Sequence, residues 1–264
     1  MVWLNSWRFG YTEEWNPFHK ILLCRVWIIY NRTIPLKVVT VEPFRQLLWM
    51  IRITLFLGRT KRMQMDVKTT PVEDVYQMLV GLVTPRPIAW VTTLSKAGVV
   101  NLAPFSFFNT FGANPPIVVF SPSLKRDGGR KDTLVNIESN GEFVVNASTE
   151  KHADLINLSS RMLPIDESEL TLTGQSTIAS TSIKPPRLAD VPFALECRVL
   201  QIIPVGNGPI SSNLVIGEVL TMHIDDSVLG EDRQPDPRKL KSIARLGGDY
   251  WCRTQDLFQL ERPN

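Results

Sequence analysis

The sequence predicts a mainly β fold, an antiparallel barrel with a few helices. Several short segments rich in β-branched and aromatic residues are separated by turns that contain Gly or Pro. Two longer segments of this kind, Ala194–Val205 and Asn213–Ile224, flank a Gly-Asn-Gly-Pro turn and predict a long hairpin. Helical periodicity is confined to short stretches, so consecutive hairpins are favoured over alternating β-α-β units.

The first predicted elements are a helix and a hairpin. Apolar residues recur at three- and four-residue intervals within Pro71–Leu82, and two acidic residues occupy the first turn, which predicts a short helix. Two prolines, Pro85 and Pro87, end that helix. Ile88–Leu94 is rich in β-branched residues and predicts a strand, which a Lys-Ala-Gly turn connects to a second strand, Val99–Ala103.

The middle of the chain predicts another strand and a helix. Pro115-Pro116 opens the strand Ile117–Ser121, and an Asp-Gly-Gly loop separates it from a helix that begins at Lys131-Asp132-Thr133. We expect Asp132 or Thr133 to cap this helix. The later elements are a strand at Phe143–Asn146, a helix at Lys151–Arg161, an irregular segment at Gly174–Lys184, and a polar tail, Asp225–Asn264, anchored by Tyr250-Trp251 and Leu257-Phe258.

The first 62 residues differ in composition from the rest of the 264-residue chain. They hold ten Lys and Arg against three Glu, and five of the seven Trp residues. We therefore expect a basic N-terminal extension at 1–62, outside a domain at 63–264, with Met63 or Met65 as the working start. The alternatives are a basic membrane-surface element or an organelle-targeting leader. Arg25 and Arg52 interrupt its two apolar runs, so a secretory signal or a spanning helix is not expected.

Composition excludes several other classes of function. The three Cys and three His residues have no disulfide-framework or zinc-site spacing, so we expect no metal and a reducing, cytoplasmic location. The chain has no P-loop, no G-x-G-x-x-G and no G-x-S-x-G motif, which argues against a dinucleotide domain and against a serine hydrolase. Residues 63–264 are mildly acidic, and no nucleic-acid partner is expected.

Two motifs point to a bound ligand. The segment Asn101–Asn109 places amides and hydroxyls between aromatic side chains, which suits a flat ligand with apolar faces and a polar edge. If this segment is one strand, Phe105 and Phe107 share one face while Ser106 and Phe108 share the other. A packed core strand is the alternative interpretation. Lys131-Asp132-Thr133 follows a Gly-rich loop at a helix start, an arrangement typical of phosphate sites, although an ordinary helix cap has the same pattern.

Taken in order, these motifs resemble those of the flavin reductase-like family, whose domain is an FMN-binding split barrel, an antiparallel Greek-key-like barrel. The resemblance extends from about Val67 to Pro263 and does not cover the N-terminal segment. The motifs that carry it are Pro85-Arg86-Pro87-Ile88-Ala89-Trp90-Val91-Thr92-Thr93, Asn101–Asn109, Pro115-Pro116, Lys131–Ile137, Glu142–Asn146, Pro185-Pro186-Arg187, Leu195-Glu196-Cys197, Gly217-Glu218-Val219 and Arg245-Leu246-Gly247-Gly248.

The resemblance implies an FMN-dependent oxidoreductase that accepts hydride from NADH or NADPH and forms a homodimer. A flavoprotein oxygenase with a small organic substrate and a non-catalytic flavin electron carrier remain as alternatives. Lys131 and Thr133 would lie beside the FMN phosphate, and Trp90 would either cover a flavin face or pack in the core. No catalytic residue is assigned. The expected cofactor-binding residues are Arg86, Trp90, Thr92, Thr93, Asn101, Ala103, Ser106, Phe107, Asn109, Ser121, Lys131, Asp132 and Thr133.

Overall fold

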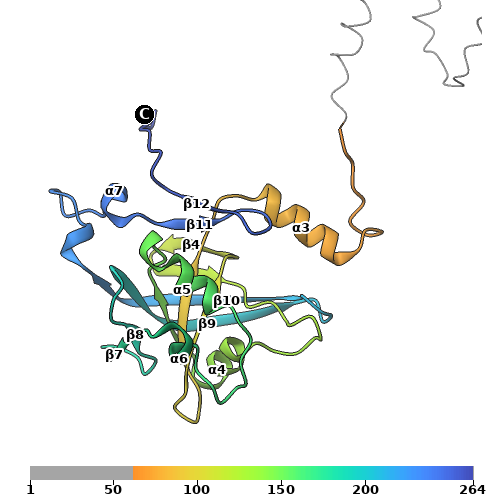
Figure 1. The fold of residues 1–264 in the computed structure, drawn as a ribbon, viewed down its shortest axis with the longest axis horizontal. Coiled ribbons are helices and arrows are strands. Elements are labelled where there is room, and N and C mark those ends of the chain that lie inside the picture. The colour runs from red at the N-terminus through yellow and green to blue at the C-terminus, as the bar shows by residue number, and fades with distance from the viewer. Residues whose placement is uncertain (1–61, 264) are drawn as a thin grey trace, which may run out of the picture. The chain divides into compact units, whose positions relative to one another are not determined.

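A seven-stranded antiparallel sheet forms the centre of the fold (Figure 1). The computed structural model describes residues 62–263, so the predicted N-terminal extension lies outside the described residues except for Arg62. The strand order is β3-β2-β6-β9-β10-β5-β4. The seven strands are β2 (Ala89–Leu94), β3 (Val100–Phe105), β4 (Phe108–Ala113), β5 (Pro116–Phe120), β6 (Glu142–Asn146), β9 (Phe193–Val205) and β10 (Ser212–Ile224).

The two edges of this sheet come together, so the sheet curls into a barrel. Strands β3 and β4 lie at opposite edges, yet only two residues connect the end of β3 at Phe105 with the start of β4 at Phe108. Three consecutive Cα steps span at most about 11 Å, which forces the edges close together. The edges share no backbone ladder in the described part of the chain, and the barrel stays split. The predicted mainly β split barrel is therefore confirmed.

The same chain segment disproves one local prediction. The segment Asn101–Asn109 is not one strand, because it bends at Ser106 and Phe107 between β3 and β4. Phe105 is buried inside the barrel, whereas Phe107 is 37% exposed, so the two rings do not share a face. The predicted alternation of faces along this segment was wrong.

Strand β2 separates two hydrophobic clusters. Val91 faces the barrel interior with Phe120 and Phe143, while Trp90 packs on the other side with Leu102 and other residues of the second cluster. The interior cluster is tightly packed at Gly217 of β10, because a Cβ there would lie 2.7 Å from Cε1 of Phe143. Both faces of β2 are therefore covered by other residues of the protein.

Seven short helices accompany the strands in the described residues. The predicted helix at 71–82 is α3 (Val72–Leu82), and the helix predicted after the Gly-rich loop is α4 (Asp132–Asn140). The expected cap was wrong, because Lys131 is the N-cap residue of α4 and no side chain bonds to its first turn. The remaining helices are η1 (Glu150–His152), α5 (Ala153–Leu158), α6 (Glu169–Thr173), η2 (Asp226–Val228) and α7 (Pro237–Leu240).

Two small sheets complete the fold. A short ladder joins β7 (Thr177–Ile178) and β8 (Arg187–Leu188), and a three-stranded sheet joins β1 (Arg86–Pro87), β11 (Ile243–Arg245) and β12 (Trp251–Arg253). The sequence did not predict the strands of the tail or the helix α6. Of the expected tail anchors, Trp251 packs against the second hydrophobic cluster, whereas the side chains of Tyr250 and Phe258 are exposed.

Two kinds of feature are absent from the described residues: membrane-spanning helices and metal-binding clusters. Between residues 62 and 263, no helix combines the length and the apolar character needed to cross a bilayer. The same residues contain no group of three or more His, Cys, Asp or Glu side chains arranged to hold a metal ion.

Candidate functional site

A cavity of about 620 Å³ lies where the two edges of the barrel meet. Its walls come from α3, the corner between β3 and β4, the loop from β5 to α4, the segment after α5, and Glu169 at the start of α6. The volume is in the range of small-molecule and cofactor sites. Aromatic rings form part of its apolar surface, among them Tyr76 of α3, which packs edge to face on Phe107 with ring centroids 6.2 Å apart.

Lys131 places a partly desolvated cation on the cavity wall. Burial lowers the pKa of this ammonium, and the nearby charge of Lys125 lowers it further. The ammonium lies 5.3 Å from the centre of the Phe105 ring, and within residues 62–263 it forms no ion pair with a carboxylate. By contrast, Lys125 lies 3.8 Å from Asp132. A partly buried cation without a counter-charge has a desolvation cost that no partner offsets, so this position favours an anionic ligand.

The start of α4 adds further anion-binding groups beside Lys131. The first amides of an α-helix have no intrahelical acceptor and carry the positive end of its dipole. No side chain caps these amides. Thr133 lies in this first turn, and its hydroxyl accepts a hydrogen bond of 2.9 Å from the amide of Asn101. Since that hydroxyl accepts, its own proton remains available to a ligand in the cavity.

Two serines, Ser121 and Ser106, also line the cavity. Ser121 follows β5, and its buried hydroxyl oxygen has no hydrogen-bond partner. An unpaired buried hydroxyl calls for an explanation, and a bound ligand supplies one. The hydroxyl of Ser106 accepts a long hydrogen bond, 3.4 Å, from Nε of Arg86, so its proton can also be directed into the cavity.

Glu169 contributes a buried carboxyl to the same cavity. One carboxylate oxygen accepts a hydrogen bond of 2.8 Å from the backbone amide of Leu102 in β3. Burial raises the pKa of Glu169, and the hydrogen bond from Leu102 opposes that increase. The carboxyl therefore braces β3, which carries Asn101 and Ala103 to the cavity.

Eight of the thirteen expected site residues line this cavity. They come from β3, the corner after β3, the end of β5 and the start of α4, four segments that the fold brings together. The eight are Asn101, Ala103, Ser106, Phe107, Ser121, Lys131, Asp132 and Thr133.

The other five expected residues do not line the cavity. Trp90 is buried in the second hydrophobic cluster, and its Nε1 donates to the hydroxyl of Ser159 at 2.9 Å. Thr92 and Thr93 are buried in β2 with their hydroxyls already paired, Thr92 donating to the carbonyl of Pro186 and Thr93 accepting from Asn136. Asn109 is exposed on β4, where its side chain bonds to the adjacent amide. Their assignment as cofactor contacts stays a prediction.

Arg86 reaches the cavity only through Ser106. Its buried guanidinium donates to the carbonyls of Val80 and Val83 at the end of α3, and to that of Leu246 at 3.1 Å. Burial lowers the pKa of this guanidinium, while the neighbouring Tyr76 raises it. Arg86 thus ties α3 and the C-terminal tail to the cavity wall.

Sequence reasoning missed several residues of the lining. Glu169 is the clearest case, and its position follows from α6, whose start is marked by the N-cap Ser168. A Ser before a short Glu-Leu-Thr-Leu segment is a helix-start signal that could have located α6. No local pattern in the sequence identifies the buried carboxyl. Tyr76, Ser123 and Arg161 also line the cavity, and each depends on long-range packing for its position.

Comparison with known proteins gives a consistent family match. A family model described as flavin reductase like domain matches residues 81–239. An uncharacterized protein of Halalkalibacterium halodurans is 38% identical over 203 residues, which cover 76% of this chain and 97% of that protein. The matched segment includes all eight expected residues that line the cavity.

Two solved structures have the same fold and are identical to this chain at about a third of the aligned residues. Nitrilotriacetate monooxygenase component B from Bacillus cereus has a TM-score of 0.72 and 33% identity, covering 76% of this chain and 100% of that chain. The 2-nitrobenzoate 2-nitroreductase NbaA of Pseudomonas fluorescens has a TM-score of 0.68 and 32% identity, covering 76% of this chain and 96% of that one.

Proposed function

Because the chain belongs to the flavin reductase-like domain family, we propose that it binds FMN in the cavity at the barrel edge. We further propose that it is an oxidoreductase that takes hydride from NADH or NADPH. The observation that carries the cofactor assignment is Lys131, a desolvated cation at a helix start with no carboxylate partner in the described residues. The phosphate of FMN supplies the missing counter-charge.

The cavity residues divide the work of holding this ligand. Lys131, Thr133 and the first amides of α4 would bind the phosphate. Ser121 and Ser106 have hydroxyl groups that can bond to the polar edge of the ring system, and Phe107 offers an aromatic surface. When bound, FMN would supply the redox chemistry, while the protein supplies position and electrostatics.

The nicotinamide donor would approach from the open side of the cavity. Because the sequence contains no dinucleotide-binding motif, we expect the donor to bind in the open cavity over the flavin. Lys125 and Arg126 lie on the loop from β5 to α4, at the same cavity, and offer positive charge to a phosphate-bearing donor. The similarity to a monooxygenase component supports a chain that passes its electrons to a partner.

A second candidate function is the reduction of a small organic substrate in the same cavity. The observation that favours it is the similarity to a 2-nitrobenzoate 2-nitroreductase at 32% identity over nearly the whole of that chain. The flavoprotein oxygenase and the electron carrier expected as alternatives use the same cofactor. These candidates therefore differ in the fate of the electrons and share one cofactor site.

Anaerobic absorption spectroscopy tests the proposal. The FMN-loaded protein is titrated with NADH and, separately, with NADPH, and the flavin absorbance is recorded before any acceptor is added. Bleaching by either donor alone supports a reductase, and subsequent reoxidation by a nitroaromatic compound favours the second candidate. An oxidised spectrum that neither donor changes, although dithionite bleaches it, supports the electron carrier and refutes the reductase.

We also propose a twofold homodimer, as expected from the family resemblance. Strands β9 and β10 carry exposed apolar side chains that a second copy would cover, among them Leu200, Val205 and Met222. Light scattering on the FMN-loaded protein measures the mass. A monomeric mass at micromolar concentration with flavin still bound contradicts the dimer. The cytoplasmic location stays a prediction from the cysteine content.

A further inference from the structure

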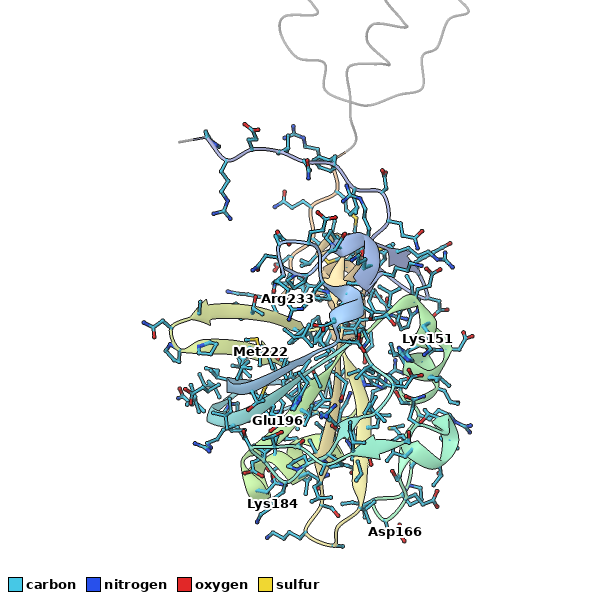
Figure 2. The ribbon with its side chains drawn as sticks, turned by 90° about the vertical axis from the view of Figure 1, so that its left-hand side faces the viewer. Lys151, Asp166, Lys184, Glu196, Met222 and Arg233 are labelled. Carbon is cyan, nitrogen blue, oxygen red and sulfur yellow. The ribbon has the colours of Figure 1, made fainter. Side chains whose placement is uncertain are left out.

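A second cavity, of about 380 Å³, lies apart from the first and shares no lining residue with it. Four segments enclose it: the residues around η1, the loop before β9, the corner between β10 and η2, and the end of α7. Lys151, which Figure 2 labels, lies on the η1 side. Nothing in the proposed flavin chemistry uses this cavity, so an inference about it stands independently of that function.

His152 places an unpartnered nitrogen at this cavity. The residue is only 2% exposed, and its Nδ1 lies 3.0 Å from the hydroxyl oxygen of Thr149. The other ring nitrogen, Nε2, is buried without a hydrogen-bond partner. Its nearest carboxylate oxygen, on Asp190 of the cavity wall, lies 3.9 Å away, beyond hydrogen-bond distance. A buried nitrogen in this state is costly unless a further molecule pairs with it.

The imidazole is suited to donate this missing hydrogen bond. Burial lowers the pKa of His152, with Asp190 opposing the effect, so the neutral ring is favoured at neutral pH. A neutral ring carries one N–H. When the Thr149 hydroxyl donates to Nδ1, the proton lies on Nε2, on the side of Asp190 and the cavity. The buried nitrogen then requires an acceptor.

The charge balance of the cavity is positive. Lys151, Lys239 and Lys241 line it together with two carboxylates, Asp190 and Asp225. Asp190 is bound by Lys151 through both oxygens, at 2.6 and 2.7 Å, and this pair is neutral.

The two other lysines have no carboxylate partner in residues 62–263. Lys239 donates to a neutral acceptor, the carbonyl of Leu229, at 2.6 Å. Lys241, the C-cap of α7 at φ 49°, forms no ion pair in residues 62–263. Asp225 uses one carboxylate oxygen to accept from the amide of Ser227 at the start of η2. Two exposed lysines from one helix end and the buried ring of His152 thus line a cavity with an apolar wall at Val191, Pro192 and Leu240.

We propose that this second cavity binds the dianion of a phosphate monoester. Lys239 and Lys241 attract its two negative charges and outnumber the one unpaired carboxylate, Asp225, and one of its oxygens accepts from Nε2 of His152. Its organic part packs on the apolar wall. The ligand pairs the one buried His nitrogen that the fold leaves unpaired in the described residues.

Nuclear magnetic resonance of the histidine side chains provides the test. The FMN-loaded protein is titrated with inorganic phosphate at constant ionic strength, so that the flavin phosphate site is already filled. We expect a saturable shift of the His152 ring nitrogens and a higher titration midpoint for that ring, because a nearby dianion favours the imidazolium. The ring of His223, on β10 and hydrogen-bonded to Glu196, serves as an internal control and should not change.

Lysine variants separate a specific site from general surface charge. Lys239→Ala and Lys241→Ala should each weaken phosphate binding by about tenfold, the loss of one charge-assisted hydrogen bond. The matched control is Lys184→Ala, an exposed lysine that lines neither cavity and lies well away from Lys151 in Figure 2.

Three results would overturn the proposal. The first is the absence of a saturable shift at His152 with millimolar phosphate. The second is an equal loss of binding in the control and in the cavity variants. The third is binding of acetate as tight as that of phosphate, which would indicate a site for any small anion.

Discussion

Replacement of Lys131 by Met tests two effects of this side chain separately: its effect on the stability of the FMN-free protein and its effect on the affinity for FMN. Burial already lowers the pKa of this ammonium, so the folded protein holds its charge at a disadvantage when no anion is present. Methionine keeps an unbranched apolar chain of similar length and can stay against the Phe105 ring. We therefore expect Lys131→Met to leave the stability of the FMN-free protein unchanged or to increase it.

The same substitution should weaken FMN binding. A charge-assisted hydrogen bond contributes about 1.5–3 kcal/mol, which corresponds to about a 10- to 150-fold increase in the dissociation constant. The first amides of α4 remain in the variant, and no side chain caps them, so part of the phosphate affinity should persist. Quenching of flavin fluorescence on binding measures the dissociation constant, and thermal melting of the apoprotein measures stability.

Riboflavin gives the matched ligand, since it lacks the phosphate. Its affinity should hardly differ between the parent and Lys131→Met. Lys96→Met is the matched protein control, because Lys96 is exposed in the turn between β2 and β3 and does not line the cavity. Equal losses of FMN and riboflavin affinity would refute the reasoning, as would a variant that binds FMN as tightly as the parent.

Three further substitutions test the packing and the electrostatics around the cavity. Gly217→Ala should lower the unfolding free energy by about 1–3 kcal/mol, because the added Cβ meets the ring of Phe143. Gly208→Ala is the matched control, because a Cβ there meets no neighbouring atom and should leave the unfolding free energy unchanged. Trp90→Phe should lower the melting temperature through a lost buried hydrogen bond, yet leave the FMN dissociation constant unchanged. Glu169→Gln should gain stability over the parent as pH rises above 4.5, because the raised carboxyl pKa makes ionisation costly in the folded state.

Each of these predictions has a clear contrary result. Equal melting temperatures for Gly217→Ala and Gly208→Ala would show that the Phe143 ring can move aside without cost to stability. A weaker FMN affinity in Trp90→Phe would indicate that the Trp90 ring contacts the cofactor. Urea unfolding at several pH values measures the third effect, and a stability difference between Glu169→Gln and the parent that does not change with pH would contradict the assigned cost of ionisation.

The larger strands could be predicted because their residues carry the signal locally. The long hairpin of β9 and β10 follows from two β-branched segments and one Gly-rich turn, and its observed bounds differ from the expected ones by one residue. Strands β11 and β12 have three residues each; β11 pairs with β1, which lies about 160 positions earlier in the chain, and β12 pairs with β11. Such short partners have no local pattern, and the sequence therefore predicts the tail only as a polar segment with aromatic anchors.

The candidate site was predictable in its chemistry and less so in its geometry. Lys131 and Thr133 line the cavity, and this could be predicted because a Gly-rich loop followed by a helix start is visible in the sequence. Thr92 and Thr93 carry the same hydroxyl group as Thr133. They belong to a central strand that is covered on both sides, so their hydroxyls form hydrogen bonds within the protein. Only the order of strands in the sheet decides between these two outcomes, and no local motif specifies that order.

A crystal structure of the protein grown with FMN tests the central claim most directly. We expect the phosphate within hydrogen-bond distance of Nζ of Lys131 and of the first amides of α4, with the ring system in contact with Ser121 and Phe107. The hydroxyl of Ser121, unpaired in the buried wall, should then donate to the ligand. Flavin bound elsewhere on the protein, or a cavity that stays free of flavin at saturating FMN, would contradict the account.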